Sequence, residues 1–273
     1  MELITELFAS NLGQRALLGI EVEATRYTLG TLGVFFGIWI ILAPWLVNRK
    51  IRAKRAPNKQ IRMELMNSFK TICVFVALDI VIFDIAETGI FKKYDDIDEY
   101  GWLWYGLSIP VAIILHDTWF YWTHRAMHHK TLYKYFHLTH HRSHNPTPFT
   151  AYSFAAGEAV VNYAFVPIMM IFMPIHGSAL AIVLLIMIYK NALAHCGYEI
   201  FPRGTTRHWL LKHSTTVTHH DMHHEKASGN YGFYFTWWDQ IMGTEHTHYE
   251  ERFDQATGAK PRAVSAAPRV SAA

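Results

Sequence analysis

The amino-acid sequence predicts an all-α integral membrane protein, in which four to five transmembrane helices lie under a cytosolic, histidine-rich helical cap that holds a di-metal site. Two observations support this fold class. Hydrophobic residues make up 51% of the 273-residue chain and are concentrated in long runs, and many of its 18 histidines recur three or four residues apart. The formal net charge of +3 is small and no RNA- or DNA-binding pattern is present, so nucleic acid is not an expected partner.

The apolar runs predict the transmembrane helices. Residues 27–47 form an uncharged stretch of 21 residues, which is long enough for a helix across about 30 Å of hydrocarbon. Further candidate spans are residues 71–91, 101–122, 159–175 and 178–194. The second candidate contains Asp79, Asp84 and Glu87, and acids at membrane depth are costly unless they face a bundle interior or a polar cavity. The sequence assigns these three acids no role.

The two ends of the chain differ from the apolar middle. Residues 1–26 have helical apolar spacing but no basic start or cleavage site of a signal peptide, so we expect an N-terminal interfacial segment. Residues 27–255 form the expected membrane-embedded domain, and residues 256–273, which lack apolar periodicity, an expected disordered tail. The two cysteines give no disulfide framework and no iron–sulfur pattern.

The distribution of charge predicts the topology. The basic stretch 48–62 follows the first span, and the positive-inside rule places it in the cytoplasm. Counting spans onward then puts the acidic loop 94–100 outside and every spaced histidine on the cytoplasmic face. A bacterial inner membrane is the favoured location, with the endoplasmic reticulum as its equivalent in a eukaryote.

Nine histidines have the spacing of metal ligands. They are His124, His128, His137, His140, His141, His195, His220, His223 and His224. Because each helical residue advances about 100°, the pair and the two triplets are each expected to aim their imidazoles at one common point. Nine imidazoles exceed the needs of one tetrahedral zinc, so two metals are predicted. Imidazole suits zinc, copper, iron and nickel, so ligand type alone leaves the metal open.

Two other classes of metal protein fit part of this pattern. A zinc-dependent membrane hydrolase would need a general base, which Glu158 or Glu225 could supply, but nine histidines are then excessive. A metal-handling transporter would place its ligands at mid-membrane in broken helices rather than at the cytoplasmic ends of spans. A redox metal pair at a lipid boundary fits better, because it can reach C–H bonds that no acid–base side chain can cleave.

The ordered motifs resemble a known family. The run His116-Asp117-Thr-Trp-Phe-Tyr-Trp-Thr-His124-Arg-Ala-Met-His128, followed by Phe136-His137-Leu-Thr-His140-His141, is similar to the first two histidine boxes of the fatty acid hydroxylase and sterol desaturase superfamily. The motifs at residues 191–197, 220–224, 230–232 and 238–244 complete the pattern. The resemblance covers roughly residues 117–244, whereas residues 1–100 match only as hydrophobic spans.

This resemblance implies a dioxygen-dependent lipid hydroxylase or desaturase with two iron ions, and with the nine spaced histidines as ligands. The substrate stays open among sterols, fatty acyl or amino-acid-derived lipids, sphingoid bases and carotenoids. Asn191 occupies a position that in related enzymes meets a metal through water or is replaced by histidine, and His116 and His219 are spare ligand candidates. The resemblance does not choose between hydroxylation and desaturation.

Asp117 is the preferred candidate for orienting a ligand. It lies seven residues before His124, within about 20° of the same helix face, and can accept a hydrogen bond from the second nitrogen of an imidazole. Asp221, Glu158 and Asp239 are looser candidates. The alternative for each is a solvated carboxylate or a helix cap.

Electrons and substrate must come from outside the chain. It has no Gly-x-Gly-x-x-Gly fingerprint, haem-attachment motif or iron–sulfur cysteines, so a separate reductase, ferredoxin or cytochrome is expected. Basic residues around the histidine boxes could dock such a donor, or could act only as topology signals. A membrane lipid is expected to enter sideways past Phe149, Tyr152 and Phe154, with its polar head near the interface; core packing is the equal alternative for these three residues.

Overall fold

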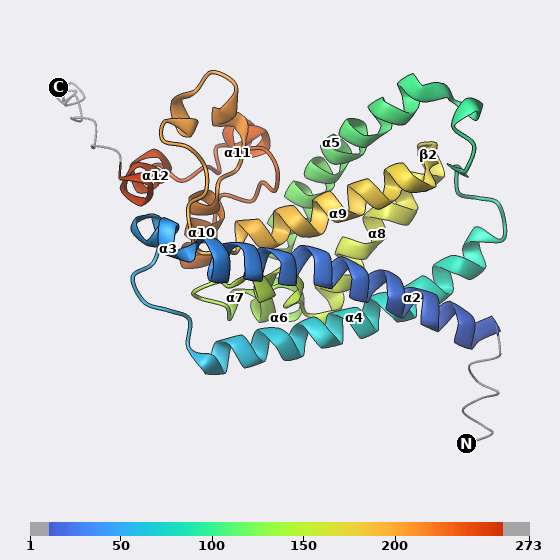
Figure 1. The fold of residues 1–273 in the computed structure, drawn as a ribbon, viewed down its shortest axis with the longest axis horizontal. Coiled ribbons are helices and arrows are strands. Elements are labelled where there is room, and N and C mark those ends of the chain that lie inside the picture. Colours follow the sequence, from blue (N-terminus) through green and yellow to red (C-terminus); the bar gives the residue numbers. More distant parts are fainter. Residues whose placement is uncertain (1–10, 259–273) are drawn as a thin grey trace.

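Long helices that alternate in direction form the body of the molecule (Figure 1). The computed structural model describes residues 11–258, and within this range the body consists of a helical rod, Asn11–Arg49, and four long helices. The four helices are α4 (Asn58–Ala86), α5 (Gly101–Met127), α8 (Ala156–Phe172) and α9 (Gly177–Ala194). The short elements that follow α5 and α9 gather at one end of this body and form the cap.

The rod extends beyond the predicted first span at both ends. Its parts are α2 (Asn11–Tyr27), the π-helical stretches η1 (Thr28–Leu32) and η2 (Phe35–Leu42), α3 (Ala43–Leu46) and η3 (Val47–Arg49). Residues 11–26, which were expected to form an interfacial segment, continue directly into the span and pack alongside α4. The rest of that expected segment, residues 1–10, lies outside the described residues.

Two of the described helices are long and apolar enough to cross a membrane, namely the rod Asn11–Arg49 and α9. Helix α8 is apolar but has only 17 residues, and α4 and α5 carry polar and charged side chains along their length. The number of spans therefore stays a prediction. The alternating direction of the long helices is the arrangement that the predicted topology requires.

The two ends of the helical body are built differently. At the end away from the cap, β1 (Lys93–Tyr94) pairs in parallel with β2 (Ile175–His176). This short pair joins the connection between α4 and α5, which includes η4 (Ile97–Glu99), to the turn between α8 and α9.

The cap consists of two sets of short elements. Between α5 and α8 lie α6 (Tyr133–Phe136), α7 (Leu138–His141) and η5 (Pro148–Tyr152). After α9 come η6 (Thr205–Arg207), η7 (Leu211–His213), α10 (Val217–Lys226), α11 (Trp237–Met242) and α12 (Tyr249–Thr257). Residues 256 and 257 thus lie in α12, and residues 259–273 of the expected tail lie outside the described part.

The rod and α9 approach each other closely at one glycine. A Cβ atom added to Gly30 would lie 2.6 Å from Cγ1 of Ile188, a side chain that is only 2% exposed. At Gly37, further along the same rod, an added Cβ would meet nothing within 4 Å. Gly30 therefore sets the separation of the rod from α9.

Replacing Gly30 with alanine is expected to destabilise the protein by about 1–3 kcal/mol, the usual cost of overpacking a buried contact. The matched variant Gly37→Ala should cause no loss, because the new methyl group enters open space. Thermal unfolding in detergent, followed by tryptophan fluorescence, measures both. Equal melting temperatures for the two variants would contradict the close approach.

The predicted topology can be tested by chemical labelling. Cysteines at Asp96, at the end with the strand pair, and at Glu251, in the cap, should react with a membrane-impermeant maleimide from opposite faces. The background should carry Cys73→Ser, since Cys73 is exposed, whereas Cys196 is buried. Reaction of both positions from the same side of sealed vesicles would refute the topology.

Candidate metal centre

The nine spaced histidines converge in the cap and form two groups. His124, His128, His137, His141 and His223 make up the first group, and His140, His195, His220 and His224 the second. Within each group the ligand nitrogens lie within 4.8 Å of one another. Eight of the nine side chains are buried and His128 is half-buried. Two centres with five and four ligand positions result.

The spacing of the histidines explains this division only in part. The i, i+4 pairs 124/128, 137/141 and 220/224 each stay together in one group, as expected for residues on one helix face. The triplets, however, do not aim at a common point. His223 joins the first group while its neighbour His224 joins the second, because successive residues diverge by about 100° around α10. His140 and His141 are divided in the same way.

Backbone carbonyls fix the protonation of several rings. His124 Nδ1 lies 3.0 Å from the carbonyl oxygen of Tyr231, and His195 Nδ1 lies 2.7 Å from that of Asn191. His223 Nδ1 lies 2.7 Å from the carbonyl oxygen of Gly229. A carbonyl can only accept a hydrogen bond, so each Nδ1 carries the hydrogen and each neutral ring keeps a lone pair on Nε2.

Glu158 performs the same task for His137. Its Oε1 lies 2.8 Å from His137 Nδ1, and both side chains are buried. A carboxylate that accepts from the outer nitrogen of a metal-ligating imidazole fixes the ring and raises its basicity. Glu158 reaches this position because it lies in the first turn of α8, at the cap end of the helical body.

The inner Nε2 atoms of the rings lie close together, and those of His124 and His137 have no hydrogen to share, because both outer nitrogens are donors. His124 Nε2 lies 2.9 Å from His137 Nε2, and His195 Nε2 lies 2.9 Å from His220 Nε2 and 3.0 Å from His224 Nε2. Two nitrogen ligands at a right angle around a metal, each bonded at about 2.1 Å, lie about 3 Å apart. The donor sets therefore fit metal ions, which would replace the repulsion between lone pairs by coordination.

Burial keeps these imidazoles neutral. Desolvation lowers the pKa of His195 to about 4 and that of His128, with a further contribution from the nearby His223, to about 2. Burial likewise lowers the pKa of His140, His220, His223 and His224 well below the ordinary value. Neutral imidazole is the form that binds a metal.

Asp117 has a different partner from the one that its helix position suggested. Its Oδ1 accepts hydrogen bonds from the backbone N–H groups of Tyr234, at 2.7 Å, and Phe235, at 3.1 Å. The carboxylate thus holds the segment after α10 rather than an imidazole. Helical phase placed Asp117 on the correct face of α5, but that face also contacts this segment.

The other two candidate acids act at a distance from the rings. Asp239 accepts from the backbone N–H groups of Tyr231, at 2.9 Å, and Gly232, at 2.7 Å, and so shapes the loop whose carbonyl holds His124. Asp221 forms an ion pair with Arg52, at 2.8 Å, which ties α10 to the segment after the rod. No sequence motif indicated the carbonyl acceptors or Arg52.

The remaining candidates lie outside both groups. His116 contacts the hydroxyl of Tyr234 at 3.1 Å, and His219 lies 3.6 Å from Asp239. The side chain of Asn191 donates to the carbonyl oxygen of Ala151 at 2.7 Å, while its own carbonyl holds His195. Asn191 therefore supports a ligand through its backbone.

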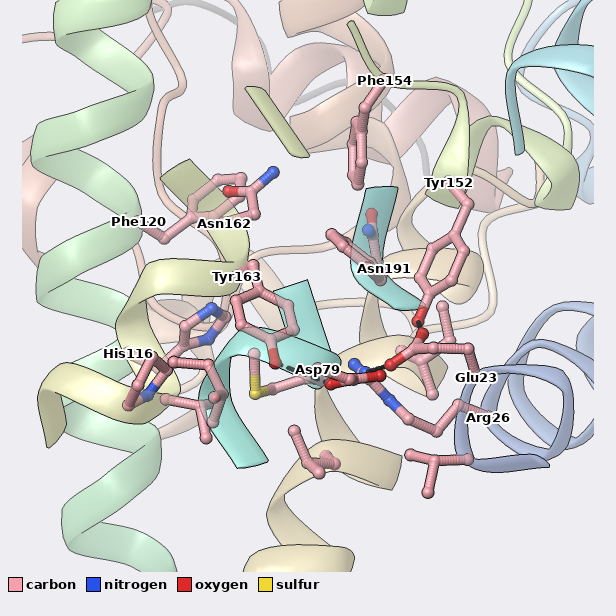
Figure 2. A pocket seen from close by; sticks show the side chains of 18 of the residues that line it. Glu23, Arg26, Asp79, His116, Phe120, Tyr152, Phe154, Asn162, Tyr163 and Asn191 are labelled. Carbon is pink, nitrogen blue, oxygen red and sulfur yellow. Dashed lines mark hydrogen bonds and ion pairs between the residues drawn. The ribbon is translucent and has the colours of Figure 1, made fainter. Parts of the chain in front are cut away.

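An apolar cavity lies within the helical body, and Figure 2 shows side chains that line it. Its lining is predominantly apolar, and it encloses about 820 Å³ of non-atom space when the open solvent at its mouth is included. Phe120 and Phe154 line the cavity and also contact His124 and His140, with ring centroids 4.9 and 5.5 Å apart. Phe120 thus separates the cavity from the first group and Phe154 separates it from the second.

Two of the three residues expected to line the substrate path do line this cavity, Tyr152 and Phe154. Phe149 is buried elsewhere, where its ring lies 5.0 Å from that of Phe35 in the rod. Because all three belong to one short segment, the sequence could not separate the cavity wall from the core.

Comparisons with known proteins agree with this site. The model of the fatty acid hydroxylase family matches residues 109–244, a range that contains all nine histidines. A Delta(7)-sterol 5(6)-desaturase of Gibberella zeae is 31% identical over 71% of this chain and 58% of its own length. The chain belongs to the fatty acid hydroxylase and sterol desaturase superfamily.

Other members of the superfamily show similar coverage. A methylsterol monooxygenase of Aspergillus fumigatus is 33% identical over 51% of this chain and 48% of its own length. A lathosterol oxidase of Rattus norvegicus is 27% identical over 68% of this chain and 62% of its own length. The chain therefore spans about half to three-fifths of the length of these relatives. No solved structure matched significantly.

The roles of Glu158 and Asp117 can be separated by substitution. Glu158→Ala leaves the Nδ1–H of His137 without its acceptor, and we expect metal affinity to fall about 10–100-fold. Asp117→Asn keeps an oxygen that can accept from the Tyr234 N–H, so metal content should remain near that of the unmodified protein. Metal retention against a chelator series, measured by elemental analysis, distinguishes them. If Asp117→Asn lost more metal than Glu158→Ala, the role of orienting a ligand would belong to Asp117.

Proposed function

We propose that this chain is a di-iron oxidoreductase of the membrane that uses dioxygen to hydroxylate or desaturate a lipid. The observation that carries the proposal is the pair of histidine groups, which contact the wall of an apolar cavity through Phe120 and Phe154. The relatives are named for sterol desaturation, methylsterol monooxygenation and lathosterol oxidation, and these activities support a lipid substrate, with sterols as one candidate class.

Each iron would be held by one histidine group, the first by five imidazoles and the second by four. When bound, such a pair supplies the activation of dioxygen and the oxidation of an unactivated C–H bond, which no side chain of the chain can perform. The role of the protein is to hold the ligands neutral and directed. The Tyr231, Asn191 and Gly229 carbonyls and Glu158 do this through the outer ring nitrogens.

The cavity would place the substrate and exclude water. Phe120 and Phe154 stand between the cavity and the two groups, so a lipid in the cavity approaches the centre past aromatic rings. An apolar wall at this point keeps bulk water from the reacting carbon. Electrons would come from a separate donor protein, for which exposed basic residues of the cap, such as Lys130 and Lys134, offer a docking surface.

The alternative of a zinc-dependent hydrolase requires a free general base. Glu158 already accepts from His137, and Glu225 forms an ion pair with Arg252 at 2.9 Å. Each of these carboxylates thus already has a partner, although Oε2 of Glu158 accepts no hydrogen bond from the described residues. The metal content of the purified protein decides between the two functions.

Purified protein is expected to carry close to two irons per chain, and to consume dioxygen when given a reductant and a lipid substrate. His140→Ala and His223→Ala remove a ligand from the second and the first group, respectively, and each should lower iron content and abolish turnover. His208→Ala, outside both groups, serves as the control. One zinc per chain, without iron and without oxygen consumption, would contradict the proposal.

A further inference from the structure

A cluster of polar side chains lines the apolar cavity away from the histidines. Glu23 and Arg26 come from α2, Asp79 from α4, Tyr152 from η5 and Tyr163 from α8, and Figure 2 shows their polar ends directed toward one another. Tyr163 lies five residues beyond Glu158, so it is about 7 Å further along α8 than the residue that holds His137. The cluster therefore lies inside the body, beyond the metal centre.

The hydrogen bonds of the cluster leave an acceptor free. Tyr152 donates to Glu23 Oε2 at 3.0 Å, Tyr163 donates to Asp79 Oδ1 at 2.6 Å, and Arg26 pairs with Glu23. Asp79 Oδ2 is buried and has no hydrogen-bond partner among residues 11–258. A buried carboxylate oxygen without a donor is costly, and a bound molecule that supplies a donor would remove that cost.

The charges of the cluster restrict the kind of molecule that fits. Glu23 and Asp79 carry two formal negative charges against the single positive charge of Arg26. Both tyrosine hydroxyls already donate to the carboxylates, so they can offer only lone pairs. An anionic head such as a carboxylate or phosphate would meet an excess of negative charge. A hydroxyl or a neutral amine could donate to Asp79 Oδ2 and also accept from the N–H of Arg26 Nε, which is likewise buried without a partner among residues 11–258.

We propose that Asp79 and its neighbours bind the polar end of the substrate, and that this end is a hydrogen-bond donor, a hydroxyl or an amine, on an apolar body. The inference rests on the proposed function and specifies its substrate class. The apolar body would lie along Phe75, Ile188 and Met187, and reach the histidines past Phe154. The polar head thus lies inside the cavity, and not near the interface as the sequence suggested.

Ligands that share one apolar body and differ only at the polar end test this inference. We would use cholesterol, its methyl ether and its sulfate, and hexadecanol, its methyl ether and palmitate. Pairwise competition for iron-loaded protein in nanodiscs, followed by native mass spectrometry, gives the preference directly. For at least one of the two apolar bodies, we expect the ligand with the free hydroxyl to bind about tenfold or more tightly than its methyl ether. It should also bind more tightly than the corresponding anion.

Two variants connect that preference to Asp79. Asp79→Asn removes the carboxylate and should reduce the preference for the hydroxyl at least severalfold. Asp84→Asn is its control, since Asp84 lies on the same helix but is 62% exposed and pairs with Arg15. Gly19→Ala leaves every charge in place and puts a methyl group about 3.1 Å from Asp79 Oδ2, so it should weaken the same preference. Gly37→Ala is its control.

The outcomes separate this inference from the proposed function. Four results would overturn the proposed binding of the polar end by Asp79. These are equal binding of the hydroxyl ligand and its methyl ether, preference for the anion, and no binding of any hydroxyl ligand. The fourth is an unchanged preference in both Asp79→Asn and Gly19→Ala. Oxidation of a lipid without such a preference would leave the enzyme proposal standing. A hydroxyl preference in protein that oxidises no lipid, even with a competent electron donor, would retain the subsite and reject the oxidation.

Discussion

The structure of the cap depends on one electrostatic constraint, that nine imidazoles must keep their lone pairs directed inward at close distance. Neighbouring Nε2 atoms such as those of His124 and His137 lie 2.9 Å apart and cannot share a hydrogen when the outer nitrogens are already donors. Bound cations would relieve this repulsion. Metal binding would then be coupled to folding of the cap, since ions held by these rings would stabilise the folded state.

The long helices meet this constraint by ending at the same level. α5 and α9 both end in the cap with histidines, and α8 begins there with Glu158. The loop after α10 then supplies two carbonyl oxygens, from Gly229 and Tyr231, to rings of the first group. Asp239 and Asp117 hold this loop through backbone N–H groups. The outer contacts of the ligands thus come from elements far apart in the chain.

The sequence predicted the nine histidines because their spacing is a local property of helices. It did not predict their division into two groups, since whether His223 or His224 faces a given ion depends on how α10 is rotated against α5 and α9. The partner of His137 was equally hidden, because Glu158 follows it by 21 residues across a turn and a new helix. Asp117, near in helical phase, was the more obvious choice. Carbonyl acceptors such as that of Gly229 leave no signal in side-chain identity.

The acids within the predicted second span show why burial must be judged in three dimensions. Asp84 and Glu87 pair with Arg15 on the exposed side of α2 and α4, where each carboxylate has a cationic partner. Asp79, only five residues before Asp84, turns into the cavity beside Tyr163. Burying a carboxylate in an apolar site costs free energy that Tyr163 alone does not offset, because one oxygen remains without a donor. A ligand that supplies this donor would stabilise the folded protein and be held in one orientation by the same contact. In this way a residue that is unfavourable for the empty cavity would decide which end of an elongated lipid faces the proposed metal centre.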